Sequence, residues 1–119
     1  MTQTQDIAWV AGLLEGEGYF GNRASTKEHN ANSIRVTLGM TDRDVIERAA
    51  EVLHGNVIGP YAKSNSKYKP MYYVQWHGTR AAGIMMTVYS FMGKRRQEKI
   101  KEILKLWKAD KRRPLSPRP

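Results

Sequence analysis

Residues 10–20 read VAGLLEGEGYF, and this stretch decides how the rest of the chain is interpreted. Apolar residues recur here at helical spacing, which predicts a helix that begins with Asp6 as N-cap and ends at about residue 17. A glycine inside a helix costs about 1 kcal/mol relative to alanine, so Gly12 and Gly16 need a structural reason. With Ala8 they lie on one ridge of the helix, where a second helix could approach the main chain closely.

The two glutamates of this stretch point in different directions. Glu15 and Glu17 are about 200° apart around a helix, so one chain cannot aim both at a single point. Glu17 lies at the helix C-terminus, where the macrodipole disfavours an anion by about 0.3–1 kcal/mol and a bound cation would reverse that sign. If two such helices cross on a two-fold axis, two copies of Glu17 converge with carbonyls of Gly16, and these hard oxygen ligands suit Mg²⁺. The spacing alone leaves open a helix that runs into a Gly-rich turn, with two surface glutamates that have no role.

Outward from this stretch, the periodicity of the sequence predicts one α+β domain. Each of two hairpins follows a helix, and two more helices follow the second hairpin. The predicted helices are residues 6–17, 42–54 and 79–91 and a fourth whose inner stripe is Ile100, Ile103, Leu104 and Trp107; the predicted strands are 19–27, 34–38, 56–63 and 70–77. We expect the strands to form a four-stranded antiparallel sheet with helices on one face and the other face open.

Local signals predict where the second and third helices begin and end. Thr41 and Asp44 make a capping-box-like start for the second helix, and Gly55 is expected to stop it. Gly93 is expected to end the third helix. Three prolines make us expect a disordered tail over residues 110–119.

The open face of the predicted sheet carries groups that bind phosphates or base edges, and few carboxylates. Two-stranded ribbons fit the major groove of DNA, where Arg or Lys reads guanine and Gln reads adenine. The candidate residues on this face are Arg23, Ser25, Lys27, Arg35, Thr37, Tyr61, Lys63, Tyr73 and Gln75. A face with this lining could also be merely solvated, and that alternative stays open at this point.

Composition narrows the choice of partner. The 119 residues suffice for one domain, and the formal net charge of +9 favours a polyanion. Residues 94–119 hold 11 basic and 3 acidic side chains, which nucleic acid or simple solvation of a terminal helix would explain. The absence of cysteine excludes disulfides, zinc ribbons, iron–sulfur clusters and thiol nucleophiles. With no apparent signal peptide or apolar span, we expect a soluble, intracellular protein of the cytoplasm, nucleoid or an organelle.

Two segments of the sequence carry a family resemblance. Residues 10–18 resemble the nine-residue signature of the LAGLIDADG homing endonucleases, with valine for the first leucine, leucine for isoleucine and glutamates for both aspartates. The run 72–76, leading through a helix to 93–97, is similar to the family's final strand, helix and Lys-Arg-Arg-Gln segment. The resemblance covers nearly all of residues 6–109.

The resemblance implies a homodimeric endonuclease, because the chain has one signature and no internal repeat. It implies double-strand cleavage of a long pseudo-palindromic DNA target with Mg²⁺, or another hard cation such as Mn²⁺, in a protein of a mobile intron or intein. The implied roles are catalysis by Glu17 and Lys94, metal binding by Glu17 and Gly16, dimer contact by Ala8, Ala11, Gly12 and Glu15, and DNA contact by the open-face residues with Arg95 and Arg96. The family often has a water-positioning glutamine after the second strand, where this chain reads Leu38-Gly39-Met40.

Two other functions remain as alternatives. One is a nucleic-acid-binding protein that keeps the fold without cleavage, either an RNA splicing maturase or a DNA-binding regulator. The other is a basic structural or ribosome-associated module, which explains the charge but not Gly12, Gly16 and Glu17 together.

Overall fold

The computed structural model describes residues 3–23, 33–62 and 69–109. Within them, the elements follow the predicted order of helix, hairpin, helix, hairpin and two further helices. They are α1 (Gln3–Glu17), β1 (Gly18–Arg23), β2 (Ser33–Met40), α2 (Arg43–Leu53), β3 (Val57–Tyr61), β4 (Met71–His77), α3 (Gly78–Val88), the 3-10 helix η1 (Tyr89–Phe91) and α4 (Lys94–Ala109). The α+β class is confirmed, whereas the expected tail at 110–119 lies outside the described residues.

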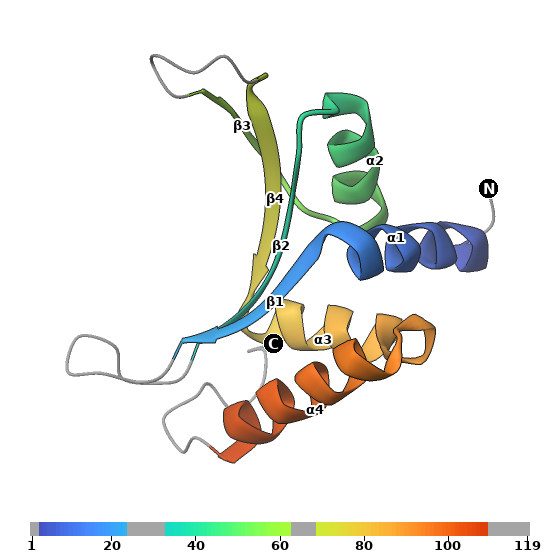
Figure 1. Cartoon of the computed structure of the whole chain (residues 1–119), viewed down its shortest axis with the longest axis vertical. Coiled ribbons are helices and arrows are strands. Elements are labelled where there is room, and N and C mark those ends of the chain that lie inside the picture. The colour runs from blue at the N-terminus through green and yellow to red at the C-terminus, as the bar shows by residue number, and fades with distance from the viewer. Residues whose placement is uncertain (1–2, 24–32, 63–68, 110–119) are drawn as a thin grey trace, which may run out of the picture.

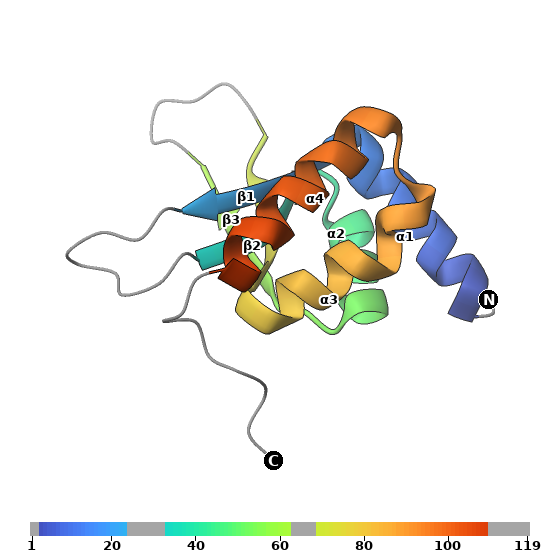
Figure 2. The ribbon, with the colours of Figure 1, turned by 90° about the horizontal axis from the view of Figure 1, so that it is seen from below.

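The strands form one antiparallel sheet in the order β1-β2-β4-β3. Figure 1 shows this sheet bent into an arc, with the helices on its convex side and the concave side bare. Seen from below in Figure 2, α3 and α4 lie side by side beneath the sheet. One face covered by helices and one open face is the predicted arrangement.

Alternation along the two central strands builds the core. Ile34, Val36 and Leu38 of β2 are fully buried, and Val74 and Trp76 of β4 are buried beside them. Side chains at every second position of a strand share one face, so these residues all point toward the helices. The predicted stripe of the last helix also faces inward: Ile100, Ile103 and Trp107 are buried and Leu104 is partly buried.

The first helix begins earlier than the sequence predicts. It starts at Gln3, so Asp6 lies in its first turn and is not the N-cap. The physical reason is that glutamine is a good helix former, which extends the helix ahead of its first apolar residue. Asp6 instead lies near Arg48 of α2, with 3.9 Å between Oδ1 and Nη2. No helix in the described ranges is long and apolar enough to cross a membrane.

The predicted bounds of α2, about residues 42–54, are confirmed to within one residue, but the predicted capping box is not formed. Asp42 is the N-cap, in an extended conformation, and its side chain makes no capping hydrogen bond. Because α2 begins at Arg43, Thr41 lies one position too early to act as the cap of a capping box.

The predicted end of α2 also needs correction. His54, and not Gly55, adopts the left-handed conformation, with φ 56° and ψ 56°. Gly55 N then donates to Ala50 O at 2.7 Å, which satisfies a carbonyl of the last turn.

Candidate nucleic-acid interface and metal-binding end

The open face of the sheet receives no carboxylate from its strands, since β1 to β4 contain neither aspartate nor glutamate. Pairing of the strands sorts the outward side chains into rows. The middle row consists of Tyr19, Thr37 and Gln75. The row on one side of it consists of Gly21, Arg35 and His77, and the row on the other side consists of Gly39, Tyr73 and Ile58. The surface is therefore cationic and aromatic, and its curvature is concave (Figure 1).

Two tyrosine rings lie over glycines on this face. A Cβ built at Gly39 would meet the ring of Tyr73 at 2.5 Å, and one built at Gly21 would overlap the ring of Tyr19. The rings therefore fill the space that side chains would take at these two positions. The guanidinium of Arg35 lies 5.5 Å from the Tyr19 ring centroid, within cation–π range.

This arrangement can read base edges. Arginine pairs with two acceptors of guanine, and glutamine pairs with the donor and acceptor of adenine. Arg35 and Gln75 lie in adjacent rows, and consecutive outward positions along a strand are about 6.6 Å apart. Each row can thus meet a different part of a bound duplex.

Most of the predicted DNA-binding residues of the strands lie on this face. Arg35 and Tyr61 are exposed there, and Thr37, Tyr73 and Gln75 are half-buried. The rings of Tyr61 and Tyr73 lie 6.1 Å apart, centroid to centroid. Of the remaining predicted residues, Arg23 ends β1 opposite Ser33, and three lie outside the described residues: Ser25, Lys27 and Lys63.

Sequence reasoning missed Tyr19 and His77 on this face. Both side chains are exposed, and His77 lies across from Arg35. Strict period-2 alternation would have found both. Tyr19 shares a face with the predicted residue Arg23 because Tyr19, Gly21 and Arg23 are two positions apart, and His77 lies two positions after the predicted residue Gln75.

The C-terminal end of α1 is bare on one side. Glu17 is exposed, and in the described part of the chain its carboxylate has no hydrogen bond or ion pair. Ala8, Gly12 and Gly16 are also exposed, and a Cβ at either glycine would meet nothing within 4 Å. Ala11, in contrast, is fully buried in the core of its own chain, so it has no exposed surface to give to a second subunit.

The donors at this end suit a hard cation. Glu17 offers a carboxylate, and the last turn of α1 offers carbonyls, including that of Gly16. The described ranges contain no group of three or more His, Cys, Asp or Glu that could hold a metal ion, at this end or any other. Among the described residues, one chain therefore brings a single carboxylate, that of Glu17, to this end of α1, and a cation held here would need further ligands.

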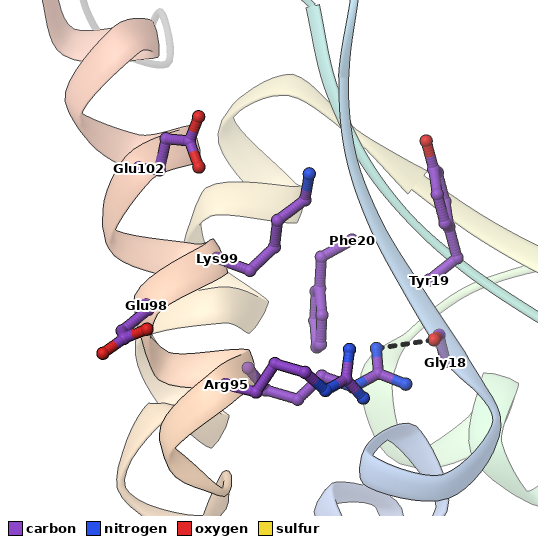
Figure 3. A pocket seen from close by; sticks show the side chains of 8 residues that line it. Gly18, Tyr19, Phe20, Arg95, Glu98, Lys99 and Glu102 are labelled. Atoms are coloured by element: carbon purple, nitrogen blue, oxygen red, sulfur yellow. Dashed lines mark hydrogen bonds between the residues drawn. The ribbon is translucent and has the colours of Figure 1, made fainter.

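The start of α4 lies against this end of α1. Lys94, the first residue of α4, and Arg95 are exposed. Arg96 turns inward, and its side chain is only 14% exposed. Arg96 Nη1 donates to Gly18 O at 2.7 Å. Figure 3 shows the groove between α4 and β1, where Lys99 reaches from α4 toward the strand.

No protein-family model matches the chain, and no curated protein matches its sequence. Solved structures do match. The homing endonuclease I-CvuI in complex with its target aligns with a TM-score of 0.64 at 18% identity, over 87% of this chain and 69% of that one. The LAGLIDADG meganuclease I-AabMI bound to uncleaved DNA aligns with a TM-score of 0.62 at 13% identity, over 83% and 34%.

The group I intron-encoded homing endonuclease I-CeuI complexed with DNA gives a TM-score of 0.58 at 18% identity, over 88% of this chain and 56% of that one. This chain has the LAGLIDADG fold. The fold that the sequence resemblance implied is thereby confirmed.

Within the LAGLIDADG fold, this chain differs from the expected pattern at the end of β2. The outward position there is Gly39, which the ring of Tyr73 covers. The side chain of Gln75 lies one row away, beside Thr37. No glutamine of β2 is available to orient a water molecule at this point.

Proposed function

We propose that this chain is a LAGLIDADG homing endonuclease, which cuts both strands of a long pseudo-palindromic DNA site as a homodimer with Mg²⁺ or Mn²⁺. The observation that carries the proposal is the position of Glu17. Its carboxylate is exposed and has no hydrogen bond or ion pair within the described residues, and it ends a helix whose small-residue ridge meets none of them. It lies directly before the edge strand of a concave sheet whose four strands carry no carboxylate. Such a protein works where its host's DNA is, in the cytoplasm, the nucleoid or an organelle.

Duplex DNA is the partner that this face favours. A concave sheet with Arg35, Gln75 and several tyrosines, and without acidic side chains in its strands, attracts phosphates and can reach base edges. I-AabMI and I-CeuI, which share the fold, are complexed with DNA. A strand rises about 3.3 Å per residue, close to the rise per base pair, so one subunit can follow roughly eight base pairs.

The ridge of α1 supports a homodimer. Ala8, Gly12 and Gly16 allow another helix to pack within contact distance of the main chain, and a two-fold axis would bring two copies of Glu17 together. A symmetric dimer would also read a two-fold-related target, with one sheet on each half-site.

The residues divide the chemistry between them. Glu17 and the Gly16 carbonyl would hold the cation, which when bound activates water and neutralises charge on the leaving 3′ oxygen. The exposed Lys94 ammonium would offset negative charge on the phosphorane-like transition state. Arg95, exposed beside it, would contact a phosphate and fix the position of the strand to be cut.

The test is cleavage of a plasmid or genomic library in the presence of Mg²⁺, with a chelator arm and two variants. We expect the wild type to linearise DNA at rare sites, and the chelator to abolish cutting. Glu17→Gln should bind the same DNA without cutting it. Glu51→Gln, which neutralises an exposed glutamate on α2, is the matched control and should cut like the wild type.

The alternative of a non-cleaving protein has its own expected result. Binding of DNA in every arm without cleavage would favour a DNA-binding regulator, and binding of structured RNA in preference to DNA would favour a splicing maturase. The specific support for a non-cleaving protein is the Leu38-Gly39-Met40 segment, which lacks the glutamine that often positions water in the family.

A further inference from the structure

A largely buried arginine side chain, that of Arg96, connects the start of α4 to the first residue after α1. Arg96 Nη1 donates to Gly18 O at 2.7 Å, and the guanidinium lies 5.5 Å from the ring centroid of Phe20. β1 is an edge strand, and its carbonyls on the free side need partners other than a neighbouring strand. Arg96 is the partner of one such carbonyl, that of Gly18, which is the residue immediately after Glu17.

A glutamate makes the reciprocal connection. Glu15 Oε1 accepts a hydrogen bond from Gly93 N at 3.1 Å. Gly93 O accepts the first bond of α4, from Gln97 N at 2.9 Å, so the carboxylate of Glu15 lies at the N-terminus of this helix, where the dipole favours an anion. A Cβ at Gly93 would approach Glu15 Oε1 to 2.7 Å, so only glycine leaves room for this contact.

The two side chains also face each other. Glu15 Oε2 lies 3.9 Å from Arg96 Nε, and within the described residues neither of these buried atoms has a hydrogen bond of its own. The Glu15 side chain is 39% exposed and that of Arg96 14%, so solvent partly screens the attraction between their opposite charges, and removal of one side chain leaves the other without this partner. We call Glu15, Gly18, Gly93 and Arg96 the α1–α4 clamp.

The clamp residues are next to the two residues to which the proposed function assigns catalysis, Glu17 and Lys94. Glu17 lies between Glu15 and Gly18, and Lys94 follows Gly93 directly. We propose that Glu15 and Arg96 are positioning residues that hold the Glu17 end of α1 at a fixed separation from the Lys94 end of α4. The catalytic role of this fixed separation rests on the proposed endonuclease function, whereas the separation of the two helix ends does not depend on it.

This assigns Arg96 a different task from its exposed neighbour. Arg95 and Arg96 are both among the residues that the sequence predicts to contact DNA. A guanidinium that is largely buried and bonded to Gly18 O is poorly placed to meet DNA, whereas Arg95 is exposed. Loss of Arg96 should therefore affect the rate of cleavage, and loss of Arg95 the affinity for DNA.

The activity test compares Arg96→Gln with Arg80→Gln. Arg80 also donates from its guanidinium to a backbone carbonyl, that of His54, so this control removes the same charge and the same kind of bond far from the clamp. Single-turnover cleavage at saturating protein should fall roughly 100-fold in Arg96→Gln, because misplacement of reacting groups by about 1 Å has effects of that size. The Kd for target DNA should not change, and Arg80→Gln should cleave at the wild-type rate.

The second readout uses free protein and needs no cleavage. In Glu15→Ala, the Gly93 amide loses its acceptor, and its hydrogen exchange should accelerate at least about tenfold relative to Glu51→Ala. In Arg96→Gln, the amides of residues 16–18 should exchange faster as well. Unchanged exchange at these positions would overturn the clamp, even if the wild type turned out not to cut DNA.

The remaining outcomes also decide the proposal. An Arg96→Gln variant that cleaves at the wild-type rate overturns the proposal, and one that keeps this rate but loses affinity for DNA shows a phosphate contact instead. If Arg96→Gln does not fold, Arg96→Lys and Gly93→Ala replace it, since lysine keeps the charge and the added methyl only displaces Glu15. Reduced rates with unchanged Kd in both support the clamp, and wild-type rates in both overturn it. A wild type without cleavage refutes the endonuclease function alone.

Discussion

At the scale of single residues, two neighbours at the end of α2, His54 and Gly55, have different structural roles. His54 takes the left-handed conformation that an L-amino acid adopts at a cost of about 1–2 kcal/mol. Gly55 is needed for a different reason, because a Cβ there would lie 2.6 Å from Val74 and 3.0 Å from Trp76. The glycine therefore permits close packing of the loop on β4, and the histidine ends the helix.

This division predicts opposite effects of two substitutions on the free energy of unfolding. His54→Gly should raise it by about 0.5–1 kcal/mol, since relief of the left-handed strain exceeds the added entropy of the unfolded chain. Gly55→Ala should lower it by about 1–3 kcal/mol through overpacking against the sheet. Urea unfolding followed by tryptophan fluorescence measures both. Stabilisation by Gly55→Ala would contradict the packing argument.

At the scale of elements, α1 has two faces with different partners. Val10, Ala11 and Leu14 are fully buried against the rest of the domain. Gly12 and Gly16 lie on the opposite side, where the described residues place no atom near them. A helix that buries one face within the chain and keeps small residues on the other is suited to pack against a second copy.

Gly12→Leu is therefore expected to separate the proposed dimer. A Cβ at this position meets no described atom within 4 Å, so the protomer should fold, while the leucine side chain should collide with a partner helix. Sedimentation should then report 13.6 kDa, and twice that mass for the wild type. Gly83→Leu is the matched control, because Gly83 is a helical glycine of α3 with equally open space.

A wild type that sediments as a monomer, or a Gly83→Leu variant that dissociates as readily as Gly12→Leu, would contradict this interface. Both substitutions should improve helix propensity by about 1 kcal/mol, so a difference between them reports the interface and not the folding of the helix.

At the scale of the whole molecule, a net charge of +9 and an acid-free sheet predict binding to DNA that weakens steeply with salt. Arg95→Gln should weaken binding to all sequences alike and reduce the salt slope by about 1. Gln75→Ala should weaken binding to the preferred target alone, by about 1–3 kcal/mol.

Fluorescence anisotropy with target and scrambled duplexes, at several salt concentrations, separates the two effects. Equal losses on both duplexes for Gln75→Ala would show that this face does not read bases. A salt slope that is unchanged in Arg95→Gln would remove Arg95 from the phosphate contacts.

Much of this molecule could be predicted without its structure. The period-2 alternation of residues 34–38 and 72–76 and the helical spacing of Ile100, Ile103 and Trp107 predicted which side chains face the core. These patterns are local, because strand and helix geometry repeat within a few residues. The signature at residues 10–18 predicted the fold through its resemblance to the LAGLIDADG family, and this resemblance is visible in the sequence because the residues of the signature are consecutive.

Only the tertiary structure could decide the rest. Glu15 meets Gly93 and Arg96 meets Gly18 across 78 positions of sequence, and the pairing of these residues follows from the packing of α4 on β1. In the same way, Tyr73 covers Gly39 because strand register makes them neighbours. Sequence alone determined the elements and their faces, since hydrophobic periodicity is a short-range property. The tertiary structure determined which functional side chains are free and which are held, since that depends on contacts between distant segments.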